Sequence, residues 1–174
     1  FNVEEYKLPT YEVTFDSYKE AYQPGDTVQM RGWAKTYSGV PVQGAKVSYK
    51  VCREPALWWF RRSDCPSEEL RVDTVVTADD GSFVLKMPMV YPEDVDLNHA
   101  VYYHVVAYAK VTDNAGETHE EQATLALSNR SAVLKVDLPS KTLRDSLKTF
   151  TVSRTNLAQE SIEGDVRYCF DGRA

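Results

Sequence analysis

The side chains best suited to acid–base catalysis in this sequence are its three histidines, His99, His104 and His119. A hydrolytic triad needs a nucleophile, a histidine and an orienting acid that meet at one point. A hairpin turning at Asn114-Ala115 would place His104 opposite about residue 125 and His119 opposite about residue 110. These two histidines would then lie roughly 20 Å apart, at about 3.4 Å per residue. We therefore expect exposed strand histidines, no catalytic residues and no enzyme activity.

An acidic stretch is the next candidate, because Asp94-x-Asp96-x-Asn98 matches the first three ligand positions of an EF-hand calcium loop. The later positions do not match, since the loop needs Gly at its sixth position and Glu at its twelfth. This chain has His99 and Val105 there. The pattern favours a solvated connection without a metal or cofactor, and an irregular calcium site is the alternative.

The three cysteines show no spacing typical of zinc ligands. Cys52 and Cys65 flank a short segment, and Cys169 lies far along the chain. A Cys52–Cys65 disulfide would close a loop of about 14 residues and would stabilise the fold by about 3 kcal/mol in the chain-entropy view. Two reduced cysteines remain the alternative.

The segment between these two cysteines contains Trp58, Trp59 and Phe60, followed by Arg61 and Arg62. Stacked aromatic rings bind sugars or protein partners, and arginines pair with carboxylates. The sequence thus suggests an interaction loop of a carbohydrate- or protein-binding module. The favoured interpretation is that these side chains plug one end of the fold or pack on a neighbouring domain.

The 174 residues carry 20 basic and 26 acidic side chains, a net charge of −6, with no basic cluster longer than Arg61-Arg62. Nucleic-acid binding requires a concentrated positive surface, so that class is excluded. No apolar stretch approaches the roughly 18 residues of a membrane-spanning helix. The sequence opens at Phe1 without a basic-then-apolar signal pattern, and we expect a fragment of a longer protein.

Apolar residues alternate with polar ones throughout the first 128 residues, and turn residues such as Asp79-Asp80-Gly81 separate the runs. About seven such runs within about 120 residues predict an antiparallel β-sandwich with immunoglobulin- or fibronectin-like topology. The expected strands cover residues 11–15, 28–35, 46–51, 70–77, 83–87, 102–111 and 117–128.

The pattern restarts after Asn129, with runs over residues 134–138, 150–153 and 166–170. Three strands in about 46 residues do not close an independent sandwich. The charge also changes there. Residues 1–128 carry 12 basic and 20 acidic side chains, giving −8, and residues 129–174 carry 8 and 6, giving +2. We expect a sandwich domain over 1–128 and a truncated second β module over 129–174.

The opening pattern Phe1-x-Val3-x-Glu5-Tyr6-x-Leu8-Pro9-x-Tyr11-x-Val13 resembles a connecting segment of the α2-macroglobulin family. In that family it leads from the second macroglobulin-like domain into the third, more often with Phe at the place of Tyr11. Tyr22-x-Pro24-Gly25-Asp26 and the stretch from Gly39 to Val47 are similar to bacterial members.

The resemblance implies that the intact protein traps proteases after a bait segment is cleaved. It also implies packing against neighbouring domains and an oxidising, extracytoplasmic location, often as a lipoprotein whose anchor lies outside this chain. The family's thioester needs Cys, then Gly or Leu, then Glu and Gln, whereas Cys169 is followed by Phe170, Asp171 and Gly172. The resemblance therefore implies a scaffold role for this segment.

Overall fold

The computed structural model describes residues 9–56, 67–137, 149–157 and 160–167. The described residues form nine β-strands and no helix. None of them therefore lies in a helix long and apolar enough to cross a bilayer. The strands are β1 (Tyr11–Phe15), β2 (Thr27–Thr36), β3 (Lys46–Pro55), β4 (Glu68–Val76), β5 (Ser82–Pro88), β6 (Tyr102–Thr112), β7 (Thr118–Ser128), β8 (Val133–Asp137) and β9 (Thr151–Thr155).

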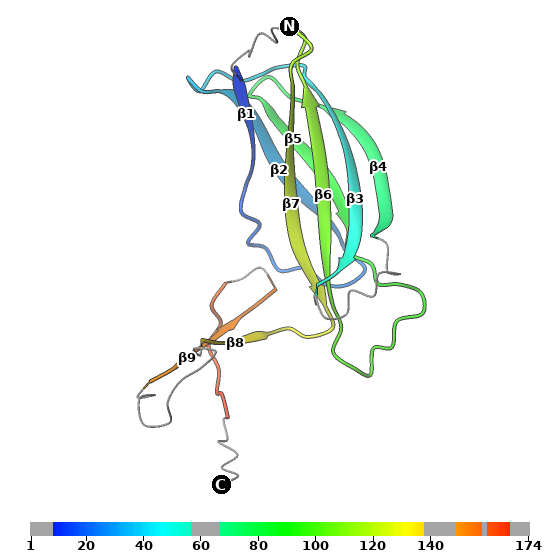
Figure 1. The fold of residues 1–174 in the computed structure, drawn as a ribbon, viewed down its shortest axis with the longest axis vertical. Coiled ribbons are helices and arrows are strands. Elements are labelled where there is room, and N and C mark those ends of the chain that lie inside the picture. Colours follow the sequence, from blue (N-terminus) through cyan, green and yellow to red (C-terminus); the bar gives the residue numbers. More distant parts are fainter. Residues whose placement is uncertain (1–8, 57–66, 138–148, 158–159, 168–174) are drawn as a thin grey trace, which may run out of the picture.

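The first seven strands form two antiparallel sheets, in the orders β1-β2-β5 and β4-β3-β6-β7. The two sheets face each other in Figure 1. Each strand turns one set of alternate side chains toward the opposite sheet, as a two-layer sandwich requires. The predicted all-β antiparallel sandwich of about seven strands is confirmed, and each strand lies within a few residues of its expected place.

The core consists of the alternating apolar side chains of the two inner faces. On β6, Val105, Ala107, Ala109 and Val111 point inward, and the side chains between Ala107 and Val111 point outward. The bulkiest fully buried side chains are Tyr11, Leu85, Met87, Met89, Leu127, Val47, Val51, Val105 and Val111.

The hairpin between β6 and β7 is shifted by one residue from the expected register. His104 lies opposite Ala126, and His119 lies opposite Val111. The shift arises because Asp113 and Glu117 close a three-residue loop, in which Gly116 has a φ of 83°. Three-residue hairpin loops favour Gly at this left-handed position, where other residues are strained.

The last two strands form a separate two-stranded antiparallel sheet, which lies apart from the sandwich in Figure 1. Leu134 and Val136 on β8 are exposed. The third strand expected in this part of the chain is not seen at Val166 and Arg167, and residues 168–170 lie outside the described residues.

Candidate functional site

The predicted interaction loop, Trp58, Trp59, Phe60, Arg61 and Arg62, lies outside the described residues, so its role stays a prediction. Cys65 also lies outside them, and the disulfide with Cys52 is untested. Cys52 itself is on β3 and is only 3% exposed. Burial raises the pKa of its thiol.

The structure does not bring the three histidines together. His104 and His119 are seven positions apart when both are projected onto β6, which corresponds to about 24 Å. His99 is exposed, and its Nε2 lies 3.7 Å from Asp96 Oδ2. His119 departs from the expectation of an exposed histidine, because it is half-buried and packs edge-on against the ring of Tyr11 with 4.3 Å between centroids.

The acidic loop uses its carboxylates to shape its own backbone. Asp96 Oδ1 accepts hydrogen bonds from both the backbone and the side-chain nitrogen of Asn98, at 2.9 and 2.8 Å. Among the described residues no group of three or more His, Cys, Asp or Glu side chains is placed to hold a metal ion.

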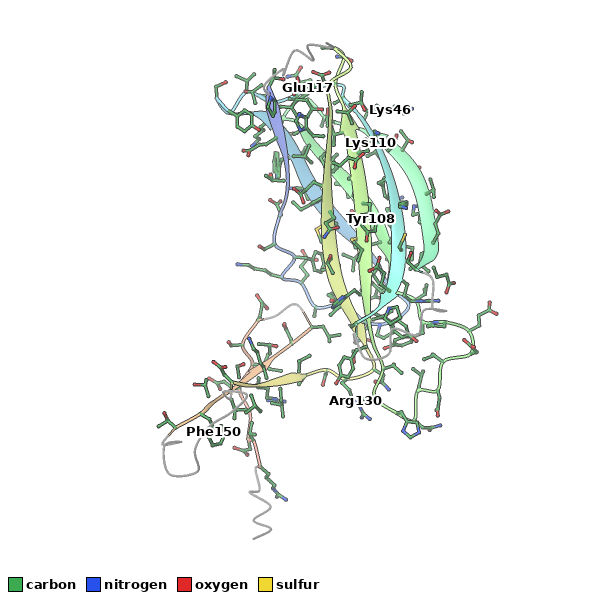
Figure 2. All side chains as sticks on the ribbon, viewed as in Figure 1. Lys46, Tyr108, Lys110, Glu117, Arg130 and Phe150 are labelled. Carbon is green, nitrogen blue, oxygen red and sulfur yellow. The ribbon has the colours of Figure 1, made fainter. Side chains whose placement is uncertain are left out.

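One side chain, Asn129, fastens this loop to the point where the chain leaves the sandwich. Its Nδ2 donates to the carbonyls of Leu97 and His99, at 2.9 and 2.8 Å, and its Oδ1 accepts from the backbone N–H of Val101 at 3.1 Å. All three partners are about 30 positions away, so no local sequence signal identifies Asn129 as an anchor. The neighbouring Arg130 marks this junction in Figure 2.

At the opposite end of the sandwich, four side chains fasten the start of β1 to the β6–β7 hairpin. The carboxylate of Glu117 accepts from the backbone N–H and the hydroxyl of Thr10, both at 2.7 Å. It also accepts from His119 Nε2 at 2.7 Å. The hydroxyl of Tyr11 lies 2.9 Å from the carbonyls of Val111 and Glu117. We call Thr10, Tyr11, Glu117 and His119 the latch. Glu117 is labelled in Figure 2.

The electrostatics of the latch follow from these contacts. The hydrogen bond from His119, followed by those from Thr10, lowers the pKa of Glu117 from 4.5 to about 2. Burial, followed by the negative charges of Asp113 and Glu117, raises the pKa of Tyr11 to about 12. Glu117 is thus held charged and Tyr11 neutral, and this combination keeps their hydrogen bonds in place.

The pKa of Glu117 makes the latch sensitive to acid. Because the pKa is lower in the folded chain, its stabilisation is fully present above about 4.5, the value for an unperturbed carboxyl, and is lost as pH falls toward about 2. We expect Glu117→Gln to melt at a lower temperature than the parent chain at neutral pH, and this difference to shrink between pH 4.5 and 2. Glu121→Gln, an exposed control on β7, should show no such convergence. A constant difference across that range would contradict the assignment.

A shallow hollow of about 1060 Å³ lies on the outer face of the four-stranded sheet, where Figure 2 labels Tyr108 and Lys110. The Tyr108 hydroxyl donates to Glu54 Oε1 at 2.9 Å, and Lys110 Nζ lies 3.4 Å from Glu120 Oε1. The hydrogen bond to Glu54 raises the pKa of Tyr108. Tyr108 and Lys110 therefore already have polar partners on this face of the sheet.

Comparisons with known proteins find likeness at the level of structure. No family model matches the sequence, and a search of curated proteins finds no significant match. The native conformation of E. coli α2-macroglobulin matches with a TM-score of 0.60 and 13% identity, covering 91% of this chain and 11% of that one. A mutant of Salmonella α2-macroglobulin matches with a TM-score of 0.58 and 12% identity, and the match covers 91% of this chain and 12% of that one. E. coli α2-macroglobulin activated by porcine elastase matches with a TM-score of 0.58 and 13% identity, and the match covers 88% of this chain and 15% of that one.

The likeness includes the sandwich and extends to the tail, because it covers 91% of the chain in both of the first two comparisons. The chain spans about 11% of the length of the E. coli protein. The structural neighbours of this chain are bacterial α2-macroglobulins, and it has the fold of a segment of those proteins.

Proposed function

We propose that this chain is a non-catalytic structural module of a bacterial α2-macroglobulin-like protein. The observation that carries the proposal is the extent of the structural match, which includes 91% of the chain within 11% of one much longer chain. The polar contacts of the latch and of Asn129 join distant segments of the described chain to one another. Both features are typical of a structural domain that positions neighbouring domains.

Within this module we assign residues 1–128 to one macroglobulin-like sandwich and residues 129–174 to the beginning of a second. The separate sheet of β8 and β9 supports the division, because it exposes Leu134 and Val136. A two-stranded sheet with an exposed apolar face needs further strands to form a core. Neighbouring domains of the same chain are therefore the partners we assign to this segment.

The intact protein, in this proposal, inhibits proteases by trapping them, and this segment spaces the reactive parts and transmits their rearrangement. The neighbours include E. coli proteins activated by trypsin and by porcine elastase. We place the protein in the periplasm or at the cell surface, with any lipid anchor outside this segment. A Cys52–Cys65 disulfide is compatible with such an oxidising compartment.

The test uses the full-length protein that carries this segment, mixed with trypsin or elastase. We expect the protease to stay active on a small peptide substrate and to lose activity on a large protein substrate, because a trapped protease is shielded from large molecules. The 174-residue chain alone is the control and should leave both activities unchanged. Inhibition by the chain alone, or no shielding by the full-length protein, would count against the proposal.

A further inference from the structure

Arg130 lies at the junction between the sandwich and the sheet of β8 and β9, and its side chain is exposed (Figure 2). Only Ser131 and Ala132 separate it from Val133, the first residue of β8. Trypsin cuts after basic residues, and exposed connections of small and polar residues are its preferred targets. The bond between Arg130 and Ser131 is therefore a point at which a trypsin-like protease would separate the two sheets' parts of the chain.

The backbone on both sides of this bond is held by the neighbouring strands. Ser128 ends β7, where it lies opposite Tyr102 of β6, and its Oγ accepts from the backbone N–H of Arg130 at 3.1 Å. On the other side, Val133 pairs with Thr155 of β9. A protease needs several extended residues around the bond that it cuts, so cleavage requires the junction to open locally.

The side chain of Asn129 opposes this opening. Asn129 directly precedes Arg130, and its three hydrogen bonds go to Leu97, His99 and Val101 in the loop between β5 and β6, residues 89–101. Among the described residues, no backbone–backbone hydrogen bond holds positions 129–132. The junction is therefore held through side chains, and Asn129 supplies most of these contacts.

The β5–β6 loop is itself fixed to the sandwich, so it can serve as an anchor. Met89 is fully buried and exchanges backbone hydrogen bonds with Gly25 and Asp26, at 2.7 and 2.8 Å. The carbonyl of Val90 accepts from the buried side chain of Arg53 at 2.6 Å. A residue that binds this loop is thereby held to the body of the sandwich.

We propose that the β5–β6 loop is a strap that, through Asn129, protects the bond between Arg130 and Ser131 from trypsin-like proteases. The inference rests on the proposed function, in which the full-length protein meets such proteases and must stay intact outside its bait segment. A cut at this junction would end any transmission from the sandwich to the sheet that follows. Asn129 is thus a positioning residue that keeps a cleavable backbone closed.

Limited trypsin digestion of the 174-residue chain, followed by mass spectrometry, measures the cut after Arg130. When opening is faster than cleavage, the rate follows the population of the open junction, so Asn129→Ala should be cut at least about tenfold faster than the parent chain. Asn98→Ala is the matched control and should be cut at the parent's rate, because Asn98 donates to Asp96 within the same loop. Equal rates for Asn129→Ala and the parent would overturn the proposal.

Two further measurements separate the strap from other causes of faster cleavage. Peptides of residues 125–136 with Asn or Ala at position 129 correct for trypsin's own preference, and a parent chain cut as fast as its peptide would refute the protection. Low urea should leave the rate after Arg130 nearly unchanged, because local opening exposes little surface. A rate that rises with urea as steeply as global unfolding would also refute the strap.

The outcome is independent of protease trapping, because the 174-residue chain is digested by itself. If Asn129→Ala behaves like the parent chain, the strap is refuted, and the proposed module function still depends on the trapping experiment. If the full-length protein traps no protease but Asn129→Ala is cut faster, the proposed function fails and the strap is supported.

Discussion

Replacing Tyr11 by alanine is expected to lower the free energy of unfolding by about 3–5 kcal/mol, as for other large aromatic side chains in cores. Tyr11 is 1% exposed and belongs to the cluster of apolar side chains between the two sheets. Its ring packs against His119, and its hydroxyl lies 2.9 Å from two carbonyl oxygens. The change therefore removes a buried ring and leaves the latch with Thr10, Glu117 and His119.

Urea unfolding of Tyr11→Ala and Tyr11→Phe separates the two contributions. Tyr11→Phe keeps the ring and removes the hydroxyl, so we expect it to cost about 1–3 kcal/mol, the range for leaving a buried polar group without its partner. Tyr37→Ala is the control, because Tyr37 is exposed on the β2–β3 connection and should change stability by less than about 0.5 kcal/mol. If Tyr11→Ala and Tyr11→Phe cost the same, the packing of the ring would be excluded as the main contribution.

The alternation of apolar and polar residues predicts the inner face of strands such as β3 and β7, but not that of β4, where Val72 and Val76 are exposed and Arg71 and Asp73 point inward. Val47 and Leu125, for example, are buried as their positions in the alternating runs imply. Side chains repeat every second residue along a strand, so an alternating run of five or more residues shows which side chains share a face. The class of fold follows from the same pattern.

The latch and the Asn129 anchor could not be predicted in this way. Tyr11 and Glu117 are 106 positions apart, and Asn129 and Leu97 are 32 apart. Alternation shows on which face a side chain lies, but not which backbone carbonyl from another strand passes beside it. The exact hairpin register was missed for a related reason, because Asn114-Ala115 alone does not show that the loop contains three residues.

A different kind of contact determines the residue at position 32. Gly32 on β2 lies between Phe15 on β1 and Phe83 on β5, its direct partners in the two ladders. The two rings meet edge to face over it, with 5.7 Å between their centroids. A Cβ atom at Gly32 would lie 2.6 Å from Phe83 Cε2 and 2.9 Å from Phe15 Cε1, closer than carbon atoms approach.

Gly32→Ala is therefore expected to destabilise the fold by about 1–3 kcal/mol, the usual cost of overpacking a core. The sign of this change in stability is informative. Replacing Gly by Ala inside a strand otherwise stabilises the fold by roughly 0.5–1 kcal/mol, because the unfolded chain then has lower entropy. Urea unfolding with an unchanged m-value measures the difference. A stabilised variant would show that the two rings can move aside at little cost.

A double-mutant cycle with Phe83→Leu attributes the effect to the ring. Leucine lacks the outer ring atoms that crowd position 32, so Gly32→Ala should cost much less in the Phe83→Leu background than in the parent chain. Contacting residues usually show such non-additive effects, and distant residues do not. If the cost is equal in both backgrounds, Phe83 is not the cause and the contact with Phe15 must account for it. The same cycle with Phe15→Leu would then show the non-additive effect, because both rings cover the one position on β2 that carries no side chain.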